Sequence, residues 1–228
     1  MKKRIDLIVD LVDSGKVTCD IGTDHGITAI KICQTKSPKK MIATDISQES
    51  LNKLRQKQEA KKYNIETLVT DGIKDLAIYE PEIIIISGMG GFLISKIISD
   101  GIELARKADK LILQANNSLA HLRSFLLDQT FDIIDEKICL EEGIYYDIIV
   151  ATYDPSHKRT YDRGYYYEYG YHLIKNREGL LKEKLLRNKK GLQAIKEQIK
   201  EIATESSRKR MEEIDKEIRE IEEVLTCL

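Results

Sequence analysis

The sequence predicts a doubly wound α/β sheet followed by a helical C-terminal region. Over the first 157 residues, short runs rich in β-branched side chains alternate with helix-forming stretches, which is typical of a parallel sheet covered by helices on both faces. Beyond about Tyr161 the strand pattern stops and helix-forming residues dominate. We therefore expect two domains, residues 1–157 and residues 158–228.

Helix-linked strands account for most of the first domain. The run Ile83–Ser87 begins with four isoleucines after Pro81, as a central strand buried on both faces would. Ser47 and Ser118 stand where each could cap the helix that follows it. The predicted strands are Val17–Ile21, Met41–Thr44, Glu66–Val69, Ile83–Ser87 and Leu111–Gln114, and the predicted helices are Ile27–Cys33, Gln48–Tyr63, Phe92–Ala105 and Leu119–Asp128.

Two further strand-like segments, Phe131–Cys139 and Tyr145–Tyr153, complete the predicted sheet. The linker between them contains Gly143 and is too short for a crossover helix, so the two segments must pair as an antiparallel hairpin at the sheet edge. Five helix-linked strands followed by a hairpin is the element order of the seven-stranded class I methyltransferase sheet. A dinucleotide dehydrogenase sheet usually ends with further parallel strands.

The second domain is predicted to be an amphipathic helical hairpin with coiled-coil packing. Its apolar residues recur at intervals of three, four or seven, and this spacing is interrupted at Ala203–Ser207, where we expect the turn. Residues 158–200 hold 12 basic and 5 acidic side chains, an asymmetry expected of a surface that faces a polyanion. Charge alone does not distinguish such a surface from a solvated helix face.

The composition of the chain bears on its cellular location and on whether it holds a metal or disulfides. The chain has no apolar run near the roughly 20 residues of a membrane span, and its N-terminus becomes charged too early for a signal peptide. Its four cysteines are scattered, which argues against a zinc site or a disulfide framework. We expect a cytoplasmic protein without a metal, acting as a monomer.

The loop after the first strand has the sequence Cys-Asp-Ile-Gly-Thr-Asp-His-Gly and opens a helix. It lies where open parallel sheets bind ligands, and Gly22 lets a ligand approach the backbone. The loop is neither a P-loop nor G-x-G-x-x-G. Its acidic side chains, Asp20 and Asp24, suit a cationic ligand without phosphates, such as S-adenosylmethionine, although an ordinary strand-helix turn would look similar. His25 lacks metal-ligand partners and is expected to form hydrogen bonds in the loop.

Acidic residues also follow the second and third strands. Asp45, followed by Ile46, could accept both hydroxyls of a ribose, although an aspartate there is also common as a cap of the next helix. Asp71, followed by Gly72, could accept a hydrogen bond from an adenine amino group. An acid at three successive strand ends predicts a nucleoside-like ligand far more strongly than any one of them.

The fourth strand ends in Ser87-Gly88-Met89-Gly90-Gly91, where a methyl acceptor should meet the donor. Glycines keep the backbone close to a ligand and leave space for a planar base. The segment has no strong side-chain acceptor for the hydrogens of an exocyclic amine, whereas a ring nitrogen with an in-plane lone pair needs none. Asp24 could orient the base or balance its charge, and it could equally bind the amino group of the cofactor.

Several of these segments occur together in one known family. They are DIGTDHG at Asp20–Gly26, SGMGG at Ser87–Gly91, LILQANNSLAHLR at Leu111–Arg123, the EEGIYYDIIVA hairpin and the helical tail. Together they closely resemble, over essentially the whole chain, the TrmK family of bacterial tRNA methyltransferases, which modify N1 of adenine 22 in the D-arm. One departure is Ala115, where many relatives have proline, so this loop should be less rigid. A second is Asp147, where the family pattern has glutamate, and we expect Asp147 to be structural.

The resemblance implies S-adenosylmethionine as the methyl donor and a coiled-coil C-terminal domain that helps to hold tRNA. It implies a catalytic role for Asp24, near the acceptor base. It also implies a basic residue, Arg4, on an N-terminal helix at the rim of the site. The cofactor-binding residues expected are Asp20, Gly22, Asp24, His25, Asp45, Ile46, Asp71, Gly72, Gly88 and Met89, and the substrate-binding residues expected are Arg4, Gln114, Asn116, Arg123, Lys158, Arg159 and Arg163.

Two alternatives remain open from the residues alone. The chain could be a non-catalytic RNA-binding protein that retains a cofactor pocket, or a nicotinamide-dependent oxidoreductase on a similar sheet. The absence of G-x-G-x-x-G and the terminal hairpin argue against the oxidoreductase. Tyrosines interleaved with the cations between residues 158 and 184 could stack on RNA or pack the tail against the sheet.

Overall fold

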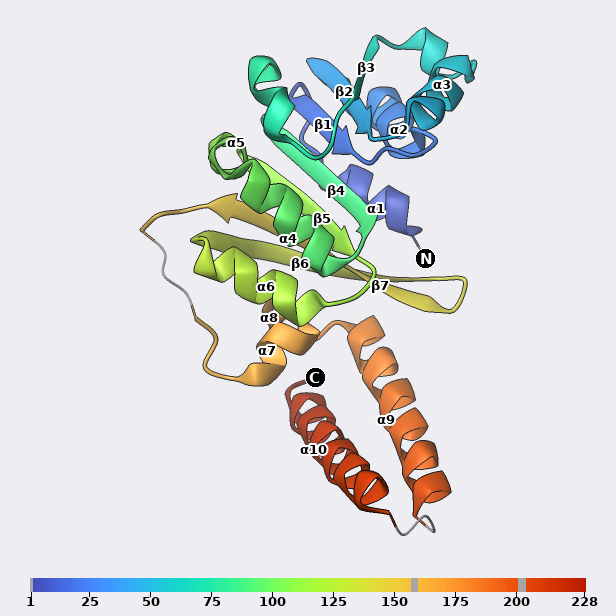
Figure 1. Ribbon diagram of the computed structural model, residues 1–228, viewed down its shortest axis with the longest axis vertical. Coiled ribbons are helices and arrows are strands. Elements are labelled where there is room, and N and C mark those ends of the chain that lie inside the picture. Colours follow the sequence, from blue (N-terminus) through green and yellow to red (C-terminus); the bar gives the residue numbers. More distant parts are fainter. Residues whose placement is uncertain (1, 157–159, 201–203) are drawn as a thin grey trace. The chain divides into compact units, whose positions relative to one another are not determined.

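The computed structural model describes residues 2–156, 160–200 and 204–228. The chain divides into two compact units, Met1–Tyr161 and Asp162–Leu228. The first unit is a sheet with helices packed on it, and the second is helical (Figure 1). Across the described ranges, every helix is too short or too polar to cross a membrane.

The sheet has seven strands in the order β3-β2-β1-β4-β5-β7-β6. Strands β1 to β5 pair in parallel, and β7 is antiparallel to both β5 and β6. This topology confirms the predicted class I methyltransferase sheet with its terminal hairpin. The strands are β1 (Val17–Ile21), β2 (Lys40–Asp45), β3 (Ile65–Val69), β4 (Ile83–Met89), β5 (Lys110–Ala115), β6 (Phe131–Glu141) and β7 (Ile144–Tyr153).

Strand β4 forms the middle of the core. The four side chains Ile83 to Ile86 are all fully buried, as the unbroken apolar run predicts for a strand covered on both faces. Strands β1 and β4 are neighbours in the sheet. The chain continues from β1 to β2 on one side of this pair, and from β4 to β5 on the other side. A ligand crevice is expected at this switch point, beyond the carboxyl ends of the strands.

Apart from α1, which precedes β1, the helices of the first unit lie between the strands along the chain. They include two 3₁₀ segments, η1 and η2, of which η2 was not predicted. The predicted helix ranges agree with α2 and α6 in position. The elements are α1 (Arg4–Asp10), α2 (Ile27–Lys36), α3 (Gln48–Gln56), η1 (Ala60–Lys62), η2 (Lys74–Tyr79), α4 (Gly91–Asp100), α5 (Ile102–Lys107) and α6 (Leu119–Asp128).

Two predicted helices are broken in the structure. The segment predicted at Gln48–Tyr63 ends as an α-helix at Gln56, because Lys57 takes an extended backbone, and Ala60 in η1 then reaches the core. The segment predicted at Phe92–Ala105 divides at Gly101. A Cβ at Gly101 would lie 2.4 Å from the side chain of Ile73, so this close approach requires glycine.

The two predicted serine caps behave differently. The Ser47 hydroxyl accepts a hydrogen bond from the backbone of Ser50 and so caps α3 as predicted. The capping role predicted for Ser118 is wrong. Its backbone is left-handed, at φ 54°, and its hydroxyl donates to Asn117 instead. An N-cap needs an extended backbone to aim its side chain at the helix amides.

The second unit contains α7 (Gly164–Tyr169), α8 (Tyr171–Lys175), α9 (Gly179–Ile199) and α10 (Glu205–Cys227). Helices α9 and α10 pack together, burying residues such as Leu185 and Ile214, as the periodicity predicts. The turn predicted over Ala203–Ser207 is wrong in its second part, because Thr204 caps α10 and the helix begins at Glu205. Residues 201–203 lie outside the described residues.

Candidate active site

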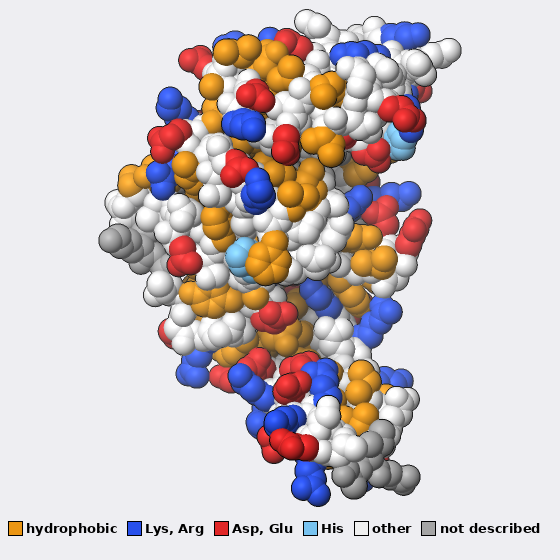
Figure 2. All heavy atoms as spheres, in the orientation of Figure 1, with side chains coloured by type: hydrophobic (Ala, Val, Ile, Leu, Met, Phe, Trp, Pro, Cys, Tyr) orange, Lys and Arg blue, Asp and Glu red, His pale blue; other side chains and the backbone are white. Residues whose placement is uncertain are grey.

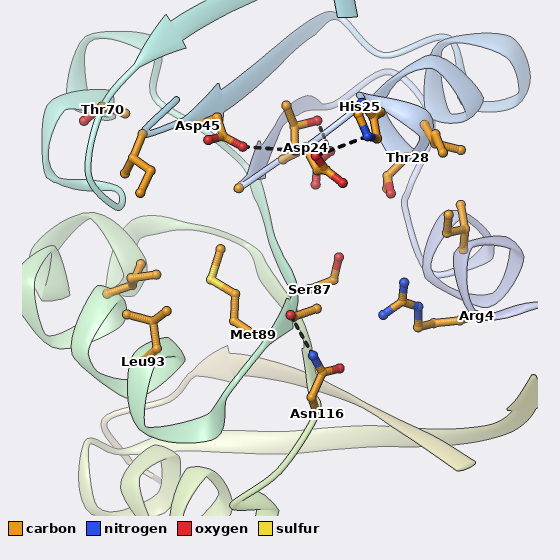
Figure 3. Close-up of a pocket in the computed structure, with 18 of the residues that line it drawn as sticks. Arg4, Asp24, His25, Thr28, Asp45, Thr70, Ser87, Met89, Leu93 and Asn116 are labelled. Carbon is orange, nitrogen blue, oxygen red and sulfur yellow. Dashed lines mark hydrogen bonds and ion pairs between the residues drawn. The ribbon is translucent and has the colours of Figure 1, made fainter. Parts of the chain in front are cut away.

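A cavity of about 710 Å³ opens at the carboxyl ends of β1 to β4 (Figure 3). Most of the residues singled out from the sequence meet there, although they are spread over more than 100 positions of the chain. The predicted residues that line the cavity are Arg4, Asp20, Gly22, Asp24, His25, Asp45, Ile46, Asp71, Gly88, Met89 and Asn116. The lining residues that were not predicted are Ile5, Thr23, Ile27, Thr28, Thr70, Ser87, Leu93 and Ile97.

Asp20 is the most deeply buried acid of the cavity, with 2% of its surface exposed. The Thr23 hydroxyl donates a hydrogen bond of 2.5 Å to its Oδ2 atom. Burial raises the pKa of Asp20 to about 6. The bond from Thr23 opposes this rise, and the charge of Asp45 adds to it. A cation placed beside Asp20 would favour its ionised form.

Asp45 orders the loop after β1. Its Oδ2 atom accepts a hydrogen bond from the backbone of Asp24 at 3.2 Å, and its Oδ1 atom accepts one from the backbone of Ser47 at 2.8 Å. Asp24 itself has a left-handed backbone at φ 48°, and one of its carboxylate oxygens lies 3.7 Å from Nε2 of His25. The Asp24 carboxylate is thereby held at the mouth of the cavity with most of its surface exposed.

The end of β4 is built around a bulge. The pairing of β4 with β5 shifts between Ser87 and Met89, and the backbone of Gly88 is left-handed at φ 79°. Such a bulge re-aims the side chains on either side of it. Across the cavity, Asp24 and Asp45 face Ser87 and Met89 (Figure 3).

A buried amide connects this bulge to the N-terminal helix. Gln114 accepts hydrogen bonds from Nη1 of Arg4 at 2.8 Å and from the backbone of Gly88 at 3.0 Å, and it donates to Asn116 at 3.0 Å. Asn116 in turn donates to the carbonyl of Gly88 at 2.7 Å. Arg4 also stacks on the ring of Tyr146, 4.9 Å from its centroid. The guanidinium of Arg4 is therefore held in a defined position and points into the cavity (Figure 3).

Gly22 allows the two sides of the cavity to approach each other. Its φ of 67° suits glycine, and an added Cβ would lie 2.2 Å from the methyl carbon of Met89. Any larger residue at position 22 would displace the Met89 side chain.

The charge of the cavity is negative. Among the described lining residues, four aspartates face one arginine, which is Arg4. An acidic cavity favours a cationic ligand and disfavours a pyrophosphate. This charge balance argues against a nicotinamide dinucleotide and fits S-adenosylmethionine, which carries an amino group and a sulfonium.

Comparison with known proteins agrees with this geometry. A family model described as a methyltransferase domain matches residues 1–149, which contain all the described residues of the cavity. The chain belongs to this methyltransferase domain family.

Relatives of this methyltransferase match over nearly the whole chain. It is 27% identical to the tRNA (adenine(22)-N(1))-methyltransferase of Bacillus subtilis, an alignment that covers 99% of this chain and 97% of the relative. The solved structure of B. subtilis TrmK has a TM-score of 0.80 at 26% identity and covers 99% of this chain and 98% of that one. A Streptococcus pneumoniae structure in complex with S-adenosyl-L-methionine has a TM-score of 0.84 at 25% identity, with 99% of both chains covered.

The substrate-binding role predicted for Arg123 is wrong. Its side chain is fully buried, where Nε donates to Glu136 at 2.7 Å and Nη2 donates to Asp147 at 3.3 Å. Burial opposes its charge, but the two carboxylates outweigh burial and raise the pKa of Arg123. Arg123 is a structural residue of the methyltransferase domain, as predicted for Asp147.

The other predicted site residues that do not line the cavity lie in different parts of the chain. Gly72 does not line the cavity. Gln114 does not line it either, but it forms hydrogen bonds with three residues that do, Arg4, Gly88 and Asn116. Arg163 belongs to the second unit, where its Nη1 atom lies 3.5 Å from Oε1 of Glu223. The remaining two, Lys158 and Arg159, lie outside the described residues.

Sequence signals existed for several of the missed residues. Thr23, Thr70 and Ser87 stand within three residues of the acids and glycines already chosen. Leu93 and Ile97 are four apart on α4 and so share one helix face. Within the described part of the chain, no group of three or more His, Cys, Asp or Glu side chains is arranged to hold a metal.

Proposed function

We propose that this protein transfers a methyl group from S-adenosylmethionine to N1 of adenine 22 in the D-arm of tRNA. The observation that carries the proposal is the acidic cavity at the carboxyl ends of β1 to β4, in a chain of the methyltransferase domain family. The full-length similarity to the B. subtilis tRNA (adenine(22)-N(1))-methyltransferase supports the choice of tRNA and of position 22.

The residues of the cavity fit the methyl donor. Asp45 keeps lone pairs for the ribose hydroxyls while it holds the loop through backbone amides. Asp71, at the end of β3, is suited to the adenine amino group. Asp20 is suited to the cationic amino group, and Gly22 leaves room for the ligand beside Met89. His25, Ile46 and Gly88 complete the proposed cofactor-binding set, whereas Gly72, which does not line the cavity, gives the turn after Asp71 its left-handed backbone.

The acceptor side needs no general base. When bound, S-adenosylmethionine supplies an electrophilic methyl group, whose bond to sulfur breaks as the lone pair of adenine N1 bonds to carbon, leaving positive charge on the base. Asp24 stands at the mouth of the cavity with its carboxylate exposed, where it would stabilise that charge. Arg4 and Asn116, fixed through Gln114, would orient the base or an adjoining phosphate.

The second unit is proposed to hold the tRNA. We assign residues 1–157 to catalysis and residues 158–228 to RNA binding through a coiled-coil hairpin, with Lys158, Arg159 and Arg163 among the contacts. Figure 2 shows blue and red side chains intermixed along this helical region. Such a monomeric enzyme would act in the cytoplasm, where its tRNA substrate is made.

Incubation with unmodified tRNA and labelled S-adenosylmethionine, followed by nucleoside analysis, tests the proposal. We expect label in 1-methyladenosine, and none when adenine 22 is replaced by guanine. Asp24→Ala should lose transfer while retaining cofactor binding, measured by calorimetry. Cofactor binding by the wild type without any transfer to tRNA would support the non-catalytic alternative and refute the proposal.

A further inference from the structure

An exposed pair of stacked rings lies beside the acceptor side of the cavity. The rings of Phe92 and His121 are 4.0 Å apart between centroids, with an angle of 28° between their planes. Phe92 nevertheless leaves 65% of its surface exposed, and His121 is exposed as well. Since one face of Phe92 lies on His121, most of the remaining exposure must come from its other face and its edge.

Both rings project from the first turns of the helices that follow the acceptor-side loops, Phe92 from α4 after the β4–α4 loop and His121 from α6 after the β5–α6 loop. Phe92 stands three residues after Met89, and His121 stands five residues after Asn116. Both Met89 and Asn116 line the cavity, as does Leu93, the residue that follows Phe92.

The two loops are joined by direct hydrogen bonds. The backbone of Gly91 donates to the carbonyl of Asn117 at 3.1 Å, and the backbone of Asn116 donates to that of Met89 at 2.8 Å. These hydrogen bonds and the packing of α4 against α6 hold the two rings at a fixed distance from the acceptor side of the cavity.

A single exposed apolar side chain on a protein surface needs no explanation. A ring supported from behind by a second ring is different, because its orientation is fixed and its open face is flat. Flat, exposed aromatic faces bind unstacked nucleobases. An adenine that leaves its stack to enter a catalytic pocket exposes the base next to it, which then has no stacking partner on one side.

We propose that Phe92, supported by His121, is a stacking platform for an RNA base adjacent to the methylated adenine. This inference rests on the proposed function, since it assumes an RNA substrate whose target base enters the cavity. The platform would stabilise the RNA with its target base extruded, and it would leave binding of S-adenosylmethionine unchanged.

Fluorescence gives a direct test, because the chain contains no tryptophan. Phe92→Trp supplies a single indole, which can be excited selectively over the tyrosines and which a stacked base should quench when an unmodified tRNA transcript with adenine at position 22 is added. Ile78→Trp is the matched control, since Ile78 is 82% exposed and does not line the cavity. Unchanged fluorescence of the Phe92→Trp variant at saturating tRNA would overturn the platform.

Substitutions separate stacking from apolar contact. Phe92→Leu keeps an apolar side chain without a ring, and we expect it to weaken tRNA binding about tenfold, as Phe92→Ala should. Phe92→Trp should bind as the wild type does. His121→Phe should preserve binding and His121→Ala weaken it. Wild-type binding by Phe92→Leu would refute stacking.

The two proposals can fail separately. Methyl transfer by the wild type, with no quenching of the indole in the Phe92→Trp variant, would refute the platform and leave the proposed function intact. Quenching of that indole without methyl transfer by the wild type would support the platform and refute the enzyme.

Discussion

Asp20 shows how a single residue couples the fold to its ligand. It lies within β1 with nearly all its surface buried, and Thr23 is its side-chain hydrogen-bond donor. A buried carboxylate is costly until a cation is placed beside it. The apo protein therefore has an unfavourable charge at the position where we propose that the cofactor places its amino group.

The raised pKa of Asp20 predicts a pH-dependent stability. A carboxyl whose folded-state pKa rises from its ordinary value to about 6 costs the apo protein stability as pH increases from about 4 to 6, and the full cost remains above that pH. The cost is about 3 kcal/mol. Asp20→Asn should therefore unfold at a higher urea concentration than the wild type at pH 7.5, with the difference shrinking towards pH 5. Equal stability at pH 7.5 would contradict this.

The same group predicts how cofactor binding depends on pH. A bound cation favours ionised Asp20, so the affinity for S-adenosylmethionine should fall as pH falls through about 6. With a pKa near 6 in the apo protein, calorimetry should show about tenfold weaker binding at pH 5 than at pH 7. The Asp20→Asn variant should bind weakly at both values and lose this pH dependence.

At the scale of the elements, a bulge in β6 determines which side chains are buried. The pairing of β6 with β7 shifts between Ile133 and Asp135. Before the shift Phe131 and Ile133 face the core, and after it Glu136 and Ile138 do. One extra residue in a strand reverses the alternation of its faces. The bulge therefore turns Glu136 inward, where it meets Arg123.

The buried triad of Arg123, Glu136 and Asp147 joins α6 to both strands of the hairpin. Arg123→Met leaves two carboxylates buried without their cation and should lower the free energy of unfolding by about 3–5 kcal/mol. Lys53→Met is the control, since it removes an exposed pair with Glu49 on α3, worth about 0.3–0.5 kcal/mol. Urea unfolding compares the two variants. A variant of unchanged stability that binds tRNA poorly would restore the substrate role predicted from the sequence.

At the scale of the whole molecule, charge differs between the two units. The cavity of the first unit is acidic, as a cationic cofactor requires, whereas basic residues exceed acidic ones over residues 158–200. Helix α10, by contrast, carries more acidic than basic side chains. We therefore expect α9 and the segment before it to contact phosphates more than α10 does.

Salt dependence measures those phosphate contacts. Replacing Lys175, Lys182 and Lys190 together by glutamine should weaken tRNA binding and flatten the plot of log affinity against log salt by about 0.7–0.9 for each phosphate that is no longer neutralised. The control replaces Lys209 and Lys216 of α10 by glutamine. Both lysines already pair with glutamates one helical turn away. A slope unchanged in the first variant would exclude these lysines from the RNA interface.

Much of the cavity could be predicted because its chemistry is local in sequence. Asp20, Asp45 and Gly88 each belong to or follow a strand that is recognisable from its apolar run, and parallel strands bring their carboxyl ends to one edge. Two features were not predictable in this way. The break at Gly101 depends on Ile73, and the missing cap at Ser118 depends on a left-handed backbone.

The sequence by itself determined the sheet with its terminal hairpin, the helical second unit and the acids of the cavity, because periodicity and loop composition need only neighbouring residues. The tertiary structure alone decided the role of Arg123, since its burial depends on a strand bulge and on carboxylates 13 and 24 positions away. It also decided that Gln114 holds Arg4 and Gly88 from behind the cavity. Whether a polar side chain faces ligand or protein depends on distant packing, which no local pattern contains.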